Sequence, residues 1–204
     1  METEQSLNAD IRQHLTGLQS ALAHMKEMVE GISLYFKADK LELQPKNIST
    51  EKEIPRIFNQ LRYYYPDHLK RYSLKIQPSL PDCCADPLLF RQAMTNLLSN
   101  VVKATQAAPS PLIRVYGQRV EGTAVLTIED NGIDLPPENR NRSFRLFKSA
   151  HARSQFPGSG VVLSIVQRIV ERHGGSIEVH SEGEGTGARF IIALPGEKHL
   201  PTAD

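Results

Sequence analysis

The stretch Asn96-Leu97-Leu98-Ser99-Asn100-Val101-Val102-Lys103 lies mid-chain and decides how the rest is interpreted. It falls within 87–107, a segment whose apolar residues cluster on one side at helical spacing. On that predicted helix Asn100 and Lys103 share one side, one turn apart, and Asn96 lies one turn earlier. An amide oxygen suits Mg²⁺, and a neighbouring lysine can neutralise phosphate charge. Taken alone, the pattern is also typical of a surface helix whose polar residues face water.

Three glycine-containing segments follow that helix in order. Asp130-Asn131-Gly132 comes after a predicted strand, where an aspartate can accept a hydrogen bond from an adenine amino group and a glycine allows close approach of the base. Gly158-Ser159-Gly160 precedes a predicted helix at 161–173, whose first N–H groups and dipole favour an anion. Gly185-Thr186-Gly187 precedes the last predicted strand. Each segment alone is weak evidence, since a sequence such as Asp-Asn-Gly also makes a plain turn. The order of these segments along the chain is more specific than any one of them.

The remaining patterns indicate a chain of mixed α and β structure. A connector at 40–50 leads to a helix at about 51–65, for which Ser49 or Thr50 is the cap and Pro55 has to lie within the first turn. Residues 131–159 are rich in Gly, Pro, Asn and Arg, which favours a long mobile loop. The apolar patterns and turn residues predict strands at 72–77, 112–119, 124–129, 176–181 and 188–194.

Residues 8–38 predict one long helix with a narrow apolar seam. The seam residues alternate four and three positions apart over four heptads: Ile11, Leu15, Leu18, Leu22, Met25, Val29, Ile32 and Phe36. Such a seam favours pairing with another helix, most readily from a second chain. The alternative is a helix that faces the core of a single globule. Gly17 and Gly31 each weaken the helix by about 1 kcal/mol, so it needs a partner.

Composition excludes several classes of protein. The 204 residues carry a formal net charge of +1, which gives no electrostatic case for nucleic acid as the main partner. The longest apolar runs are far shorter than the roughly 20 residues of a membrane helix, so no membrane insertion is expected. The N-terminal sequence lacks a secretory signal. Cys83 and Cys84 are the only cysteines, and sequence neighbours rarely bridge, so a reducing cytoplasm is expected.

Together the four segments resemble the ATP-binding module of sensor histidine kinases, the GHKL or Bergerat fold. The best match is to kinases of the bacterial phytochrome type, through Phe144-Arg145-Leu146-Phe147, the run His151 to Gly158, and Ile169-Val170-Glu171-Arg172-His173-Gly174-Gly175. The resemblance spans about residues 10–195. It implies an α+β two-layer sandwich, with a mixed sheet packed on helices and a long N-terminal helix before it. The implied division is 1–43 for a second dimerisation helix and linker, 44–196 for the ATP-binding domain, and 197–204 for a disordered tail.

The resemblance also implies roles for particular residues. Asn100 would bind Mg²⁺, Lys103 the phosphates of ATP and Asp130 the adenine, and Asn96 and Lys103 would be the catalytic residues. The remaining cofactor-binding positions that it implies are all glycines: Gly132, Gly158, Gly160 and Gly187.

Three positions depart from the family pattern towards larger residues. Val101 stands where the family has alanine, and Asp134 and Val162 stand where it has glycine. If position 134 needs a positive φ, a non-glycine residue costs roughly 1–2 kcal/mol there. Its carboxylate would also lie close to an anionic ligand. We therefore weigh weakened nucleotide binding against tolerance of each residue by a small backbone shift.

Two functions follow from these signals. The leading one is the catalytic region of a two-component sensor histidine kinase, an enzyme that phosphorylates a histidine on a partner helix with Mg-ATP. The chain itself lacks the family's acceptor-histidine context, since neither His14 nor His24 is followed by it. The alternative is a pseudokinase interaction module that dimerises or docks a kinase or response regulator. Another GHKL protein, such as an anti-sigma kinase, matches the heptad helix and lid less well. The expected partners are a second copy through 8–38 and a response regulator or partner kinase.

Overall fold

The computed structural model describes residues 42–65, 69–134, 162–181 and 186–196, together with Phe144 and eight separate N-terminal positions. These eight are Leu15, Leu18, Leu22, Met25, Lys26, Val29, Ser33 and Lys40. The side chains of Tyr64 and Leu69 are not described.

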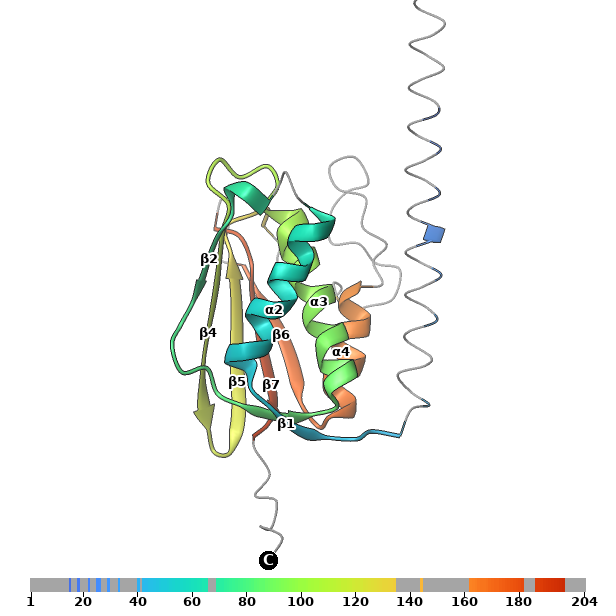
Figure 1. The fold of residues 1–204 in the computed structure, drawn as a ribbon, viewed down its shortest axis with the longest axis vertical. Coiled ribbons are helices and arrows are strands. Elements are labelled where there is room, and N and C mark those ends of the chain that lie inside the picture. The colour runs from blue at the N-terminus through green and yellow to red at the C-terminus, as the bar shows by residue number, and fades with distance from the viewer. Residues whose placement is uncertain are drawn as a thin grey trace, which may run out of the picture.

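A five-stranded mixed sheet forms one layer of the fold (Figure 1). Its order is β2 (Ser73–Ile76), β4 (Leu112–Val120), β5 (Thr123–Asp130), β7 (Arg189–Pro195) and β6 (Ser176–His180). β2 runs parallel to β4, and all other neighbours are antiparallel. Burial alternates along β6 and β7, so one face of the sheet packs inward and the other does not. All five predicted strands are present.

Three helices cover the inner face of that sheet, as Figure 1 shows. They are α2 (Thr50–Tyr64), α3 (Pro87–Ala104) and α4 (Val162–Arg172). Buried side chains of α3, β5 and β7 meet in the core, among them Leu97, Leu98, Leu126, Ile128 and Ile192. The predicted two-layer α+β sandwich is therefore confirmed.

Local differences from the sequence prediction have physical causes. Because α2 begins at Thr50, Pro55 lies in its second turn and not in the first. Ser49 occupies the cap position without a side-chain hydrogen bond. α3 ends at Ala104, three residues before the predicted end at 107. The next residue is Thr105, whose hydroxyl donates to the Val101 carbonyl oxygen at 2.8 Å.

Three short elements have no counterpart in the sequence prediction. β1 (Lys46–Ile48) pairs antiparallel with β3 (Cys83–Ala85) in a separate two-stranded sheet, and η1 (Leu69–Arg71) is a single 3-10 turn. β1 falls within the predicted connector at 40–50. Elements of three residues are too short to show a periodic pattern, so the sequence gives little sign of them.

The N-terminal seam is described only in part. Leu15, Leu18, Leu22, Met25 and Val29 are helical, and their exposed fractions lie between 53% and 66%. The helix over 8–38 as a whole stays a prediction.

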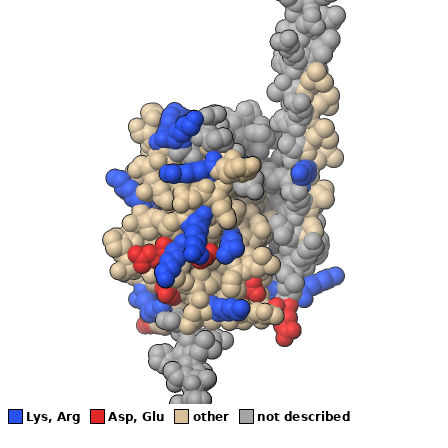
Figure 2. Space-filling model, in the orientation of Figure 1, with Lys and Arg blue, Asp and Glu red and all other residues tan. Residues whose placement is uncertain are grey.

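Charged residues on the helical side of the molecule carry both signs. Figure 2 shows acidic side chains beside basic ones on this face. Glu53 of α2 contacts Arg56 at 2.9 Å and Arg91 of α3 at 3.1 Å. No helix of the described residues is long and apolar enough to cross a membrane.

Candidate functional site

The end of β5 carries a buried carboxyl group with an unused acceptor. Asp130 is 3% exposed, and its Oδ1 accepts the Gly132 N–H at 2.8 Å. Its Oδ2 is buried and has no hydrogen-bond partner among the residues that the structure describes. The pKa of Asp130 is raised to about 7, and burial is the largest cause; the backbone N–H groups of Gly132 and Ala188 oppose the rise, and the carboxylates of Asp134 and Glu129 add to it. An orphaned buried acceptor is costly and points to a ligand that donates a hydrogen bond.

The turn after Asp130 packs against the C-terminal end of α3. A Cβ atom added to Gly132 would lie 2.5 Å from the Ala104 carbonyl oxygen, and the Ile133 N–H donates to that same oxygen at 3.1 Å. Glycine is therefore required at 132 by the helix that it touches. The sequence argument had assigned this glycine to the approach of a base. The packing brings the end of β5 next to the helix end that carries Lys103.

Asn131 fixes the same turn from the other side. Its Oδ1 accepts the Leu112 N–H, and its Nδ2 donates to the Ser110 carbonyl oxygen, both at 2.8 Å. These bonds tie the turn to the start of β4. The sequence analysis gave this residue no role of its own, although Asx side chains commonly hydrogen-bond to backbone in turns.

Gly187 of the last glycine segment lies directly against Asp130. Its φ is +73°, and an added Cβ would collide with the Asp130 carbonyl oxygen. The Asp130 N–H donates to the Ala188 carbonyl oxygen at 2.9 Å, and the Ser181 hydroxyl donates to the Gly187 carbonyl oxygen at 2.7 Å. Two of the predicted segments, far apart in sequence, therefore meet at one end of the sheet.

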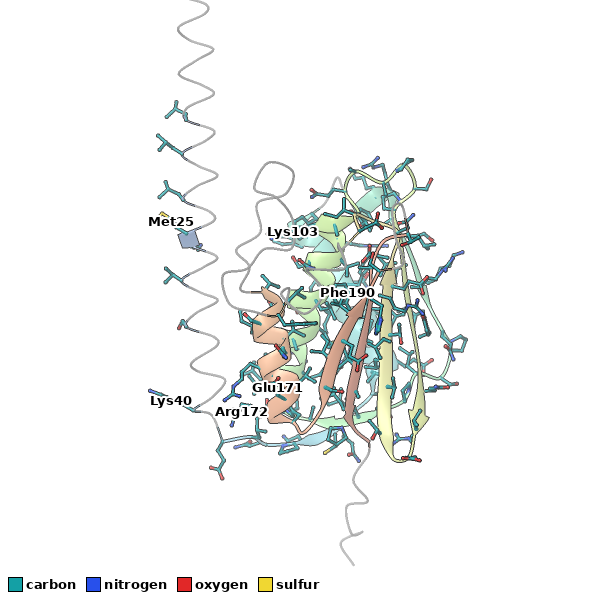
Figure 3. All side chains as sticks on the ribbon, turned by 180° about the vertical axis from the view of Figure 1, so that it is seen from behind. Met25, Lys40, Lys103, Glu171, Arg172 and Phe190 are labelled. Carbon is teal, nitrogen blue, oxygen red and sulfur yellow. The ribbon has the colours of Figure 1, made fainter. Side chains whose placement is uncertain are left out.

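The predicted residues of α3 line one side of the helix near that end. Asn96, Asn100 and Lys103 are all partly buried, and Asn96 Oδ1 accepts from Gln92 Nε2 at 3.0 Å. Figure 3 shows Lys103 near the C-terminal end of α3, at the opposite end of the helical layer from Glu171 and Arg172 of α4. Among the described residues, no cluster of three or more His, Cys, Asp and Glu could hold a metal. A Mg²⁺ ion at Asn100 would therefore need further oxygen ligands from a bound phosphate.

A buried polar network that the sequence analysis missed lies beside Asp130. The Tyr72 hydroxyl donates to the Val102 carbonyl oxygen at 2.6 Å, and the Thr105 hydroxyl oxygen lies within hydrogen-bond distance of the Tyr72 hydroxyl oxygen, at 3.2 Å. Burial raises the pKa of Tyr72; the Thr105 bond and Arg71 lower it, and the Asp130 charge raises it further. Tyr72 precedes β2, so the sequence offered only a strand-flanking aromatic residue as a signal.

The three enlarged positions differ in what surrounds them. Val101 is fully buried and belongs to the hydrophobic core. Val162 is the partly buried first residue of α4. Asp134 is not strained in the way that a positive φ would cause, because the described non-glycine residues with positive φ are Ser79 and Glu121. The Asp134 carboxylate instead accepts hydrogen bonds from the Thr186 and Gly187 N–H groups.

Two predicted site residues belong to the segment between β5 and α4. Gly158 and Gly160 lie outside the described residues, as does most of the predicted loop at 131–159. Within that loop Phe144 is described, and it is partly buried against the core.

Comparison with known proteins adds an independent line of evidence. A sequence model of the family "Histidine kinase-, DNA gyrase B-, and HSP90-like ATPase" matches residues 85–198. Phytochrome-like protein Cph1 of Synechocystis is 26% identical over 196 residues, which is 96% of this chain and 25% of that protein. Sensor histidine kinase CusS of Escherichia coli K12 is 30% identical over 178 residues, which is 85% of this chain and 36% of that protein.

The chain thus spans about a quarter to a third of the length of these curated relatives. Among solved structures, full-length ShkA in complex with AMPPNP superimposes with a TM-score of 0.71 at 22% identity. The superposition covers 93% of this chain and 39% of ShkA, and at that identity it supports the fold alone.

Proposed function

Because the chain belongs to the histidine kinase-, DNA gyrase B- and HSP90-like ATPase family, we propose that it binds ATP at the end of the sheet where Asp130 and Gly187 meet. Membership of this family and the match to sensor histidine kinases confirm the resemblance drawn from the sequence. The catalytic activity and the partners of the whole protein are part of the proposal.

The observation that carries this proposal is the orphaned Oδ2 of Asp130. No described residue donates to this buried acceptor, and its turn is held on three sides by α3, β4 and the residues just before β7. The exocyclic amino group of adenine is a donor of the required kind. Binding would satisfy the acceptor, and the fixed turn would orient the base at little entropic cost.

The phosphate end of the nucleotide would lie along α3. Lys103 would neutralise phosphate charge, and the amide oxygen of Asn100 would hold Mg²⁺ together with phosphate oxygens. Asn96, whose Oδ1 accepts from Gln92, would act with Lys103 as a catalytic residue. Bound Mg²⁺ supplies charge neutralisation for phosphoryl transfer. Gly132 and Gly187 contribute by close backbone packing, and Gly158 and Gly160 are assigned to the pocket by resemblance alone.

With this site the chain would act as the catalytic region of a sensor histidine kinase. Its residues would hold ATP so that the γ-phosphoryl group reaches a histidine on a partner helix, which is catalysis by positioning and charge. We place the ATP-binding domain at 44–196, after a dimerisation helix and linker at 1–43, with a tail at 197–204. A phytochrome-type kinase and a cytoplasmic location are further parts of the proposal. The location is supported by the buried free thiols of Cys83 and Cys84.

An interaction module without turnover is the second candidate. It is favoured by the larger residues Val101 and Val162 at family positions for small ones. The exposed seam residues Leu18, Leu22 and Met25 offer the surface for self-association or for docking a kinase or response regulator. The two candidates share the fold and differ in whether the nucleotide binds and reacts.

One comparison of ligands tests the adenine assignment directly. Calorimetric titration of the full chain with Mg-ATP and with Mg-ITP, whose base carries an oxygen in place of the amino group, should show ATP binding at least tenfold more tightly. Asp130→Ala should abolish that preference, and Glu178→Gln, an exposed carboxylate on β6, should retain it. Equal affinities for ATP and ITP in the wild type would refute the assignment.

Turnover is tested separately. The chain should phosphorylate a histidine-bearing dimerisation helix supplied in trans, and Asn100→Ala should eliminate the phosphohistidine. Nucleotide binding without any phosphohistidine on a range of such helices would favour the interaction module.

A further inference from the structure

Asp134 joins two segments of the chain that are more than fifty residues apart. Its Oδ1 accepts the Thr186 N–H at 3.0 Å and the Gly187 N–H at 2.8 Å. Two N–H donors on one carboxylate oxygen form a compact, charge-assisted contact. A glycine at this position, as in the family pattern, has no side chain with which to make it. We call this contact the 134–187 clip.

The clip closes a ring of contacts around Asp130. The Gly187 peptide is held by Asp134 at its nitrogen and, through its carbonyl oxygen, by Ser181. Its α-carbon packs so tightly against the Asp130 backbone that no side chain fits. The Asp130 N–H donates to the next residue, Ala188. The packing of Gly187 and the hydrogen bond to Ala188 together fix the backbone that carries the Asp130 carboxyl group.

We propose that Asp134 is a positioning residue for the nucleotide site, whose carboxylate clips the Thr186–Gly187 turn to the segment after β5 and so holds the Asp130 carboxyl group in place. The proposal rests on nucleotide binding at Asp130. The sequence suggested that the larger residue at position 134 weakens nucleotide binding. In this proposal the same residue supports the site. The carboxylate is directed to backbone N–H groups, which offset its charge near an anionic ligand.

The clip also places a negative charge near Asp130. Among the described residues, the carboxylates that raise the pKa of Asp130 are Asp134 and Glu129, and the Asp130 charge in turn raises the pKa of Tyr72. Removing the charge of Asp134 while keeping its hydrogen bonds should therefore make Asp130 easier to ionise. This electrostatic effect can be measured apart from the geometric one.

Two substitutions separate geometry from charge. Asp134→Asn keeps an oxygen acceptor for both N–H groups and loses the charge, whereas Asp134→Gly loses both. Glu178→Gln serves as a control for loss of a surface charge. Each variant is first checked for folding by thermal unfolding.

Amide hydrogen exchange, followed by NMR on the full chain without ligand, tests the clip itself. We expect the Thr186 and Gly187 amides to exchange at least tenfold faster in Asp134→Gly and within about threefold of wild type in Asp134→Asn. Unchanged exchange in Asp134→Gly would overturn the clip. If Asp134→Gly fails to fold, Asp134→Ala takes its place in every measurement.

Two further measurements test its role in positioning. The NMR-detected titration of the Asp130 carboxyl group should have a lower midpoint in Asp134→Asn than in wild type. The affinity for Mg-ATP is measured from pH 5.5 to 8.5. At every pH in this range Asp134→Gly should bind at least fivefold more weakly than wild type. In Asp134→Asn the highest affinity should equal that of wild type, and the plot of affinity against pH should be displaced to lower pH.

The outcomes are distinguishable. Faster exchange in Asp134→Gly with unchanged Mg-ATP affinity would leave the clip as a stabilising contact only and overturn its positioning role. If the wild type binds no Mg-ATP, the proposed function fails, and the exchange and titration results alone decide whether Asp134 holds Asp130.

Discussion

At the scale of single residues, the decisive feature is the environment of the Asp130 carboxyl group. The group is buried, one oxygen accepts a hydrogen bond from the Gly132 N–H, and the other has no partner in the described part of the chain. Its pKa is raised to about 7, chiefly by burial. The folded protein therefore retains a proton that the unfolded chain releases near the ordinary aspartate pKa of 3.8.

This linkage predicts how stability depends on pH. Below about pH 4 Asp130 is neutral in both states and its contribution is fully present, and the contribution is lost as pH rises through about 7. Asp130→Asn removes the ionisation. Relative to wild type, the variant should gain on the order of 2 kcal/mol of unfolding free energy between pH 5 and pH 8. Denaturant unfolding at the two pH values measures this gain. A difference between the two proteins that is independent of pH would contradict the prediction.

At the scale of elements, α3 is fixed by contacts at both of its ends, and its C-terminal end carries the proposed site. At its N-terminus the Asp86 side chain accepts from the Leu88 and Leu89 N–H groups at 3.0 and 3.2 Å and also from Gln44 N–H at 3.1 Å. The Asp86 N–H donates to His173 Nε2 at the end of α4. At its C-terminus the Ala104 carbonyl meets the turn that carries Gly132.

The C-terminal contact predicts a strong effect of one methyl group. Gly132→Ala would place a Cβ against the Ala104 carbonyl oxygen, so the turn has to move away from α3. We expect a loss of about 2 kcal/mol or more in unfolding free energy, together with weaker Mg-ATP binding. Gly122→Ala is the matched control. It has open space around the new atom and carries only the cost of a positive φ, about 1 kcal/mol. Equal losses in the two variants would show that the turn accommodates the methyl group.

At the scale of the whole molecule, the described residues present a row of exposed apolar side chains in the N-terminal segment. They are Leu15, Leu18, Leu22, Met25 and Val29. Their spacing matches a heptad seam, which is the surface that helix pairing buries.

Self-association through that seam is testable by a single charge. Leu22→Glu should shift the chain towards monomer in sedimentation velocity, because the seam would have to bury a carboxylate. Lys26→Glu introduces the same side chain at an exposed helical position outside the seam, and it should leave the association state unchanged. A wild-type chain that stays monomeric at high micromolar concentration would rule out the seam as a dimer interface.

The sequence by itself determined the features that depend on short-range patterns. The helix that carries Asn100 and Lys103, the strands of the five-stranded sheet and the Asp130-Asn131-Gly132 turn follow from periodicity and turn residues within a few positions. Membership of the ATPase family could also be read from the order of those segments. Its site residues at 158 and 160 stay predictions, since they lie outside the described residues.

Only the tertiary structure decided how the segments combine. Gly132 contacts Ala104, Asn131 ties its turn to Ser110, and Asp134 accepts a hydrogen bond from Gly187, whereas the sequence had left strain and charge repulsion at position 134 as one of two alternatives. The two partners in each contact are 21 to 53 residues apart in the sequence. A local pattern indicates which residues can form a turn. The folded sheet and helices decide which distant backbone groups come within hydrogen-bond distance of the N–H groups and carboxylates in that turn.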